Sequence, residues 1–348
     1  MSILEDAMNL AVRHLPDAKS DPLIGASRVL GQSVSRVDGS LKVMGRARFA
    51  AEVPFRNITY AALVHSSIAR GAVRAIDTHA AKAAPGVFLV MTHENAPKLP
   101  PQPLMMADPK GAAGSNLPVM QDASIHWNGE TVALVVAETQ EQADYAASLV
   151  GVTYDAQPAA TVFQIEKAHA KEPEKILGDS TTIKIGDAEE ALATSTFKVD
   201  HIYRTPRHNH AAIELHAVTV AWEDGTLTVH DTTQMVNLTQ STFAKMFGIA
   251  ESQVRILSPF VGGGFGNKGV WTHHVLAIAA ARMIGRPVRL VLTREGVFRA
   301  TGGRTCTKQR VALGAEPDGT LNALIHTGLA GMTSHNDCPE QFSFPARH

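Results

Sequence analysis

The chain has 348 residues, 45% of them hydrophobic, and this length and composition are enough to bury a core in two or three globular domains. Its 32 Lys and Arg residues balance 33 Asp and Glu residues, so the net charge of −1 excludes a global attraction to nucleic acid or to an anionic membrane. No apolar run is as long as a membrane span, which needs about 18 residues. Residues 1–25 lack the basic region and the apolar region of a secretory signal. We expect a cytoplasmic protein, or a periplasmic one if a partner carries the export signal.

The two cysteines, Cys306 and Cys338, lie far apart in the sequence and form no Cys-x-x-Cys pair. The chain therefore encodes neither an iron–sulfur cluster nor a structural zinc site. We expect both thiols to be reduced and to take no part in the chemistry.

Composition divides the chain into four parts. Residues 1–27 are predicted as an N-terminal arm, and residues 28–155, in which short strands and helices interleave, as one α/β or α+β domain. Residues 156–185 are rich in Lys and Glu, which predicts a solvated linker. Residues 186–348 form a second domain that ends without a closing element. A partner chain that completes its core is one interpretation of this end, and a frayed tail is the other.

In the first domain, apolar runs and turn residues predict short elements. Strands are expected at 46–51, 59–64, 87–92, 130–137 and 150–155, and helices at 76–84 and 140–149. Residues 97–118 contain six prolines, so they are predicted as an exposed segment with little regular structure.

The second domain is predicted to begin with a helix that Asp187 caps and to contain two hairpins, one of them turning at Asp224 and Gly225. A helix before Gly285 is expected to end there, because glycine readily takes the left-handed conformation of a helix C-cap. The expected helices are 187–193, 235–247 and 272–284, and the expected strands are 197–203, 217–222, 226–230, 254–258, 288–293, 309–314 and 321–326.

A glycine-rich loop between residues 261 and 268 separates a strand from an apolar helix and is the most informative stretch of the chain. Glycine has no Cβ, so this loop can reach positive φ and bring its backbone N–H groups against a bulky anionic ligand. A tight turn that lets the helix pack on its strand is the alternative. Both interpretations remain open from these residues alone.

The same loop contains a G-x-G-x-x-G pattern from Gly264 to Gly269, with Glu295 as a candidate ribose partner. This pattern would suit a nicotinamide-dependent dehydrogenase, although residues 259–261 separate the glycines from the strand. A Walker loop is excluded, because Lys268 is followed by glycine rather than by Ser or Thr.

Three further groups of residues have side chains that carry chemistry. Each has a second interpretation: a polar face for the metal-ligand types, a helix cap for the lone amide, and a solvated surface for the phosphate-binding types. The metal-ligand types are His208, His210, Glu214 and His216, the lone amide is Gln234 at the end of residues 231–234, and the basic residues are Arg299, Arg304, Lys308 and Arg310.

Five segments, taken in order and spacing, resemble the molybdenum-binding subunit of the xanthine dehydrogenase and aldehyde oxidase family. These segments are 39–49, 129–139, 210–216, 232–234 and 261–266. The resemblance implies an α/β hammerhead domain followed by the first part of a molybdopterin-binding domain. It also implies a molybdenum hydroxylase that oxidises an aldehyde or an N-heteroaromatic with oxygen from water.

By position, the resemblance implies that the Gln234 amide contacts the apical oxo ligand of molybdenum, and that the loop residues Gly263, Gly264, Phe265 and Gly266 approach the pterin. It implies no direct metal ligand in this chain. Gly269 stands on the substrate side, where xanthine-type enzymes carry a glutamate, and this difference argues against a purine substrate.

The family subunit is longer than this chain, and its general base lies in the part that has no counterpart here. The resemblance therefore implies a chain that is inactive without a complementary C-terminal molybdopterin-binding chain. The implied cofactor is molybdenum–molybdopterin in the cytosine dinucleotide form, with [2Fe–2S] clusters and FAD on partner subunits. A non-catalytic scaffold that packs on the same partners is the alternative from another class.

Overall fold

The structure is a computed structural model that describes residues 33–105, 108–159, 170, 172, 175–176 and 179–331. The chain divides into two compact units, and the described residues of the first are 33–47. This unit contains one short helix, α2 (Gly39–Val43). The predicted N-terminal arm and Cys338 lie outside the described residues.

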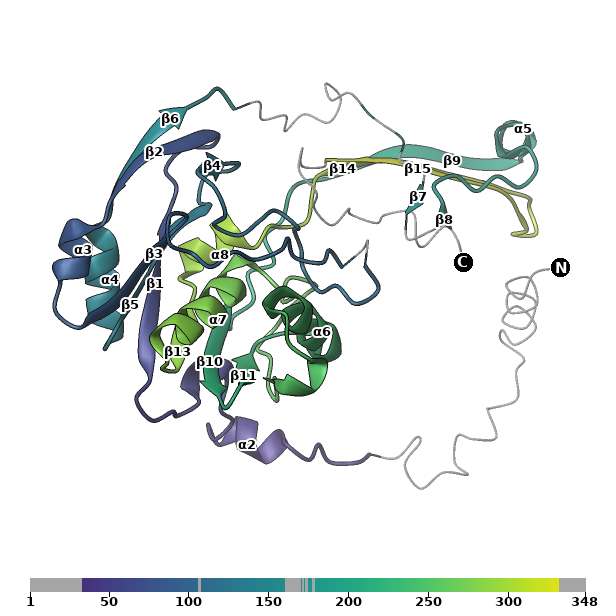
Figure 1. Cartoon of the computed structure of the whole chain (residues 1–348). Helices are drawn as coiled ribbons and strands as arrows, with labels where there is room; N and C mark the ends of the chain where they lie inside the picture. The colour runs from purple at the N-terminus through teal and green to yellow at the C-terminus, as the bar shows by residue number, and fades with distance from the viewer. Residues whose placement is uncertain are drawn as a thin grey trace. The chain divides into compact units, whose positions relative to one another are not determined.

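The larger unit is built on a seven-stranded mixed sheet with the order β12-β11-β10-β13-β1-β5-β3 (Figure 1). Parallel pairing of β1 with β13 joins residues from the two sides of the predicted linker, as at Thr59 and Val288. The strands are β1 (Thr59–His65), β3 (Val87–Thr92), β5 (Thr131–Ala137), β10 (Ala217–Glu223), β11 (Thr226–Asp231), β12 (Val254–Leu257) and β13 (Val288–Val291).

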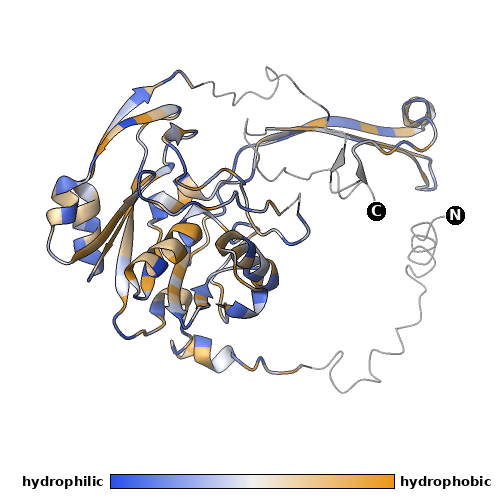
Figure 2. Ribbon diagram, in the orientation of Figure 1, coloured by the Kyte–Doolittle hydropathy of each residue, from blue (hydrophilic) through white to orange (hydrophobic). Residues whose placement is uncertain are grey.

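Helices cover this sheet and bury its apolar strands. All seven residues of β5 are buried, as its continuous apolar sequence predicts for a strand that is covered on both faces. Figure 2 shows hydrophobic residues gathered on the central strands and on α7. The helices are α4 (Gln140–Ser148), α6 (Val236–Phe247), α7 (Thr272–Ile284) and α8 (Arg294–Ala300).

The turn and helix caps predicted for the second half of the chain are confirmed. Asp224 and Gly225 have φ values of 48° and 77°. Positive φ at both central residues of a two-residue turn matches the twist of the strands, and this turn joins β10 to β11 as a hairpin. Gly285 ends α7 in the left-handed conformation with φ 65°. The Asp187 side chain accepts a hydrogen bond from the Glu190 amide and caps α5 (Ala188–Thr194).

Two smaller sheets complete the larger unit, together with the two-residue strands β7 (Lys175–Ile176) and β8 (Asp179–Ser180). The first has the order β15-β14-β9, with β9 (Phe197–Thr205), β14 (Thr307–Ala315) and β15 (Leu321–Ala330). Helix α5 covers one of its faces, where Leu192 packs against Ala312, Ala323 and Ile325. The second has the order β4-β2-β6, with β2 (Gly71–Asp77), β4 (Ser124–Ile125) and β6 (Gly151–Ala156).

Two local predictions are wrong, and some elements were not predicted. Residues 46–51 form no strand, because the Phe49 N–H donates to the Glu52 carboxylate and the chain turns into a 3₁₀ helix, η1 (Ala50–Glu52). The predicted helix at 76–84 is confirmed only for α3 (His79–Ala83), since Ile76 pairs with Val152 as part of β2. Strand β2 and helix α8 were missed.

Residues 97–118 contain no helix or strand in their described part, as predicted, but they are not exposed throughout. Ala112 and Ala113 are buried in the main core. The Ala112 N–H donates to the Thr242 hydroxyl, and the Val270 N–H donates to the Ala112 carbonyl. These two bonds hold the segment against α6 and against the residues that follow the glycine loop.

Candidate functional site

The glycine loop leaves β12 and crosses to α7 with a backbone conformation that glycine adopts most readily. Gly263 and Gly266 have φ values of 92° and 84°, and Phe265 between them has φ 55°. The Phe265 side chain is 63% exposed. Positive φ in this loop, expected from the sequence, is confirmed.

Gln234 lies directly on the loop. A Cβ built on Gly264 would lie 2.3 Å from the Gln234 side chain, so no other residue fits at position 264 without moving the amide. The Gln234 N–H donates to the Lys268 carbonyl at 2.9 Å, and its side-chain oxygen accepts from the N–H groups of Gly266, at 3.0 Å, and Lys268, at 3.4 Å. Gln234 and the loop therefore form one unit.

These bonds fix which way the Gln234 amide points. Backbone N–H groups only donate, so the atom that faces Gly266 and Lys268 has to be the oxygen. The NH₂ group is left on the other side of the side chain, which is exposed. The arrangement presents a hydrogen-bond donor beside the glycines.

Consecutive amides of the loop have no acceptor within the part of the chain that the structure describes. Among the hydrogen bonds that join described residues, none uses the N–H of Gly263, Gly264 or Phe265. The guanidinium of Arg304 donates to the Phe265 carbonyl at 3.0 Å and places a positive charge beside them. Consecutive amides that have no described acceptor, next to a cation, suit an anion.

A buried ion pair holds the two ends of the loop together. The Glu214 carboxylate accepts from the Gly262 N–H at 2.5 Å and from the Lys268 ammonium at 2.7 Å. The Lys268 side chain is fully buried and that of Glu214 is 14% exposed. Burial lowers the pKa of Lys268, and the bond to Glu214 opposes this shift.

A layer of buried polar side chains supports the loop from α7. His274 Nε2 bonds to the Asp231 carboxylate at 2.9 Å, and the backbone N–H of Trp271 donates to His274 Nδ1 at 3.1 Å. The Trp271 indole donates to the Asn267 carbonyl at 2.6 Å, and a nitrogen of His216 lies 3.3 Å from the same oxygen. Burial lowers the pKa of His216 to about 4, so this imidazole is neutral at pH 7.

The residue types considered as metal ligands do not converge. Residues 206–216 form no strand apart from the single bridge between His208 and Arg304. Within the part of the chain that the structure describes, no three His, Cys, Asp or Glu side chains form a group that would hold a metal ion. Glu214 instead clamps the loop, and His216 supports it.

The basic residues do not form one phosphate site. Arg299 pairs with Glu295 at 2.6 Å, and Arg310 pairs with Glu189 and Asp200. Only Arg304 reaches the loop. The pairing of Arg299 also occupies the carboxylate that was considered as a ribose partner.

The sheet topology differs from that of a dinucleotide-binding domain. Strands β12 and β13, which flank the glycine loop and α7, are separated by β11 and β10. The adjacent parallel strands of a βαβ unit are therefore not formed around the G-x-G-x-x-G pattern.

Gly269 is buried under the loop rather than on its exposed side. A Cβ at this position would lie 2.7 Å from the Ala112 carbonyl oxygen and 3.1 Å from the Met235 methyl group. This packing is a reason for glycine that is independent of substrate, and the predicted substrate-side role stays a prediction.

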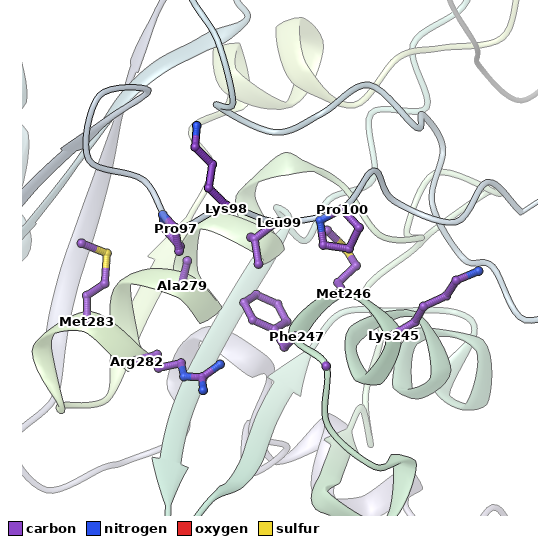
Figure 3. A pocket seen from close by; sticks show the side chains of 11 residues that line it. Pro97, Lys98, Leu99, Pro100, Lys245, Met246, Phe247, Ala279, Arg282 and Met283 are labelled. Carbon is purple, nitrogen blue, oxygen red and sulfur yellow. The ribbon is translucent and has the colours of Figure 1, made fainter.

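A hollow elsewhere on the molecule contains none of the predicted site residues. It lies between residues 97–100 and the ends of α6 and α7, where Leu99, Phe247 and Met283 line it (Figure 3). Two of the cations at its rim are already engaged, since Lys245 pairs with Asp108 and Arg282 lies over a tryptophan ring.

Sequence reasoning missed several residues that shape the site. Nothing in the sequence marks Arg294, whose guanidinium donates to the carbonyls of Ala212 and Ile213. Trp271 and His274 had only their positions after the loop as a signal. Candidate membrane-spanning helices were sought among the described residues, and none is long and apolar enough.

The chain matches two family models. Residues 44–158 match the aldehyde oxidase and xanthine dehydrogenase a/b hammerhead domain, and residues 168–341 match the molybdopterin cofactor-binding domain. The second match covers half of the chain and includes Gln234 and the glycine loop.

Curated relatives are longer than this chain. The aldehyde oxidoreductase molybdenum-binding subunit PaoC of Escherichia coli K12 is 35% identical over 310 residues, which are 87% of this chain and 40% of that subunit. The nicotinate dehydrogenase large molybdopterin subunit of Eubacterium barkeri is 28% identical over 306 residues, which are 85% of this chain and 69% of that subunit. The chain thus spans about 40% of the length of PaoC.

Solved structures share the fold. An aldehyde oxidoreductase from Desulfovibrio desulfuricans matches with a TM-score of 0.71 at 22% identity, over 90% of this chain and 36% of that chain. A CO dehydrogenase from Oligotropha carboxidovorans matches with a TM-score of 0.70 at 24% identity, over 86% and 39%. With its hammerhead domain and its glycine loop in a molybdopterin-binding domain, the chain belongs to the molybdenum-binding subunits of the aldehyde oxidase and xanthine dehydrogenase family.

Proposed function

We propose that this chain forms one side of the cofactor site of a molybdenum hydroxylase, which oxidises an aldehyde or an N-heteroaromatic with water as the oxygen source. The observation that carries the proposal is the Gln234 amide, whose oxygen is held by two loop N–H groups so that its NH₂ faces away from them. An oxo group is an acceptor that such a donor fits.

The residues around the loop fit a molybdenum pterin. The loop turns through positive φ at Gly263 and Gly266, the amides of Gly263 and Gly264 have no bonds to described residues, and Arg304 adds a positive charge. An anionic pterin can therefore lie against peptide surface and receive several hydrogen bonds. When bound, this group supplies the metal centre for oxygen transfer and for a two-electron oxidation.

This chain contributes binding and orientation. The Glu214–Lys268 pair fixes the ends of the loop, and the buried layer around His274 and Trp271 fixes its floor. These contacts set the direction of the Gln234 donor before any ligand arrives, which is what preorganised electrostatic stabilisation requires. The general base is assigned to the partner chain.

The partners and the form of the cofactor are proposed from the resemblance. They are a complementary C-terminal molybdopterin-binding chain, a [2Fe–2S] subunit, an FAD subunit, and the cytosine dinucleotide form of the cofactor. The lengths of the relatives support the first of these, since the match covers only 40% of PaoC. The molybdopterin subunit of nicotinate dehydrogenase, of which 69% is matched, supports a subunit not much longer than this chain.

Oxygen labelling tests the proposal. The complex purified from its source, assayed with aldehydes and N-heteroaromatics, an artificial electron acceptor and H₂¹⁸O, should place ¹⁸O from water in the product. Product oxygen taken from O₂ would contradict the proposal. A complex without turnover and without molybdenum would favour the scaffold alternative.

A further inference from the structure

One face of the β15-β14-β9 sheet, here called the uncharged face, is apolar at its far end and polar toward the glycine loop. Register places alternate residues of the three strands on this face: the row of Val199, Leu313 and Leu324 is apolar, and the later rows include His201, His326, Tyr203 and Gln309. No Asp, Glu, Lys or Arg occurs on it from the row of Phe197 to the row of Thr205. Figure 2 shows hydrophobic residues recurring along this sheet.

The large side chains of this face are solvent-exposed. Phe197 is 60% exposed, Val199 48%, Tyr203 52%, Leu321 66% and Leu324 54%. Stable single chains seldom leave such a contiguous apolar surface in water, and depletion of charged residues is characteristic of the centre of an interface. The face is therefore suited to another polypeptide.

The opposite face of the same sheet provides a contrast. There α5 packs through Leu192 on Ala312 and Ile325, and Arg310 forms ion pairs with Asp200 and Glu189. This face has its own cover and its own charges. Among the described elements, none provides the equivalent for the uncharged face.

The position of the sheet indicates which polypeptide covers it. At the end of the sheet nearest the glycine loop, the hydroxyls of Thr205 and Thr307 bond at 2.7 Å. Beyond them His208 forms a backbone bridge with Arg304, and the Arg304 guanidinium donates to the Phe265 carbonyl in the glycine loop. A chain seated on the sheet thus begins beside the cofactor loop. The part of PaoC beyond the 40% that matches is long enough to cover both.

We propose that the uncharged face of the β15-β14-β9 sheet is the docking surface for the complementary C-terminal molybdopterin-binding chain. The inference rests on the proposed function for the identity of this partner. Covering the face removes apolar side chains from water, and the same partner then extends over the glycine loop.

Site-specific photo-crosslinking tests the inference in the natural complex. A benzophenone amino acid replaces Val199 on the uncharged face or, as a matched control, Ile202, which is 55% exposed on the opposite face of the same strand. After irradiation in the source cells, mass spectrometry identifies the crosslinked peptides. We expect position 199, and not position 202, to crosslink to a chain that aligns with the C-terminal part of PaoC.

Other crosslinking results would overturn the inference. Crosslinks from position 199 to a second copy of this chain or to an iron–sulfur or flavin subunit would assign the face to a different partner. Equal crosslinking at positions 199 and 202, or none at 199, would show that the face is not an interface.

A charge placed on each face gives a second test. Leu324→Asp should lower the amount of partner chain that copurifies by at least about tenfold, because it buries an unpaired carboxylate. Leu329→Asp, at a position that is 39% exposed on the other face, should change it little. Circular dichroism confirms that both variants fold, and equal copurification would contradict the inference.

Molybdenum content of the same preparations separates this inference from the proposed function. A molybdenum-containing complex without crosslinks at position 199 would overturn only the docking surface. A crosslinked complex without molybdenum or pterin would overturn only the proposed function.

Discussion

Gln234 has no close polar partner for its NH₂ among the described residues, whereas its oxygen is doubly bonded to the loop. We predict that Gln234→Ala lowers kcat of the assembled complex by about 10² to 10³, as the loss of one preorganised donor does. Molybdenum content and copurification of partners should be nearly unchanged. Steady-state kinetics together with metal analysis measure both.

Gln240 is the control for this prediction. Its side chain donates to the carbonyls of Glu251 and Val254, which lie outside the glycine loop, so Gln240→Ala should affect stability more than kcat. If Gln234→Ala turned over at the wild-type rate, Gln234 would be removed from the site.

The Glu214–Lys268 pair should dominate the stability of the loop. Glu214→Ala leaves a buried ammonium without its carboxylate, and we expect a loss of about 3–5 kcal/mol in the free energy of unfolding. Lys268→Met added to Glu214→Ala removes the uncompensated charge and should restore part of this loss. Urea denaturation of the wild type, Glu214→Ala, Lys268→Met and the double variant measures the effect, and purely additive losses would contradict a buried pair.

His216 should make the protein sensitive to acid. Its pKa is about 4 in the folded chain and about 6.5 when unfolded, so the unfolded chain binds more protons between these values. Stability therefore falls as the pH decreases from 6.5 to 4, by on the order of 1 kcal/mol per pH unit. His273, whose pKa is also lowered by burial, acts in the same direction.

His216→Gln removes this titration. The free energy of unfolding of the variant, measured between pH 7 and pH 4.5, should fall less steeply than that of the wild type. An identical slope would mean that His216 is protonated as readily in the folded chain as in the unfolded one.

At the scale of elements, a side chain added to the glycine loop should block cofactor binding through a steric clash. Gly264→Val places a Cβ 2.3 Å from the Gln234 side chain and must displace it, so we predict that the complex assembles with little molybdenum. Gly151→Val, whose Cβ would have its nearest contact at 3.6 Å, is the control for the chemical change. Metal analysis of both complexes decides, and full occupancy in Gly264→Val would contradict the prediction.

The elements that the sequence predicts correctly are those whose own residues determine their conformation. Asp224 and Gly225 force a hairpin, Gly285 ends a helix, and the uninterrupted apolar run of β5 identifies a covered strand. Strand β2 has no such signal, because its conformation depends on pairing with β6 far along the chain. The burial of Ala112 likewise depends on α6 and Val270, which the prolines around it do not indicate.

The site likewise has features that local sequence patterns predict and features that depend on the fold. Bare glycines predicted a loop for an anionic ligand, and the resemblance singled out Gln234. The clamp between Glu214 and Lys268 was not predicted, since it joins residues 54 positions apart through a fold that local patterns do not encode. Glu214 was instead considered as a metal ligand, because carboxylates and histidines near one another in sequence suit both roles.

At the scale of the whole molecule, strands from the two sides of the predicted linker form one sheet. Thr59 in β1 donates its hydroxyl hydrogen to the Pro287 carbonyl across 228 positions, beside the parallel pairing with β13. The hammerhead region and the cofactor loop are therefore held by one continuous core. The separation into domains 28–155 and 186–348 remains a prediction from composition.

A cryo-electron microscopy map of the complex purified from its source tests the central claim most directly. The account predicts density for a molybdenum pterin against Gly263 to Gly266, with the NH₂ of Gln234 directed at the metal and a second chain closing the far side. A loop packed only against protein side chains, with the cofactor bound elsewhere or missing, would contradict it.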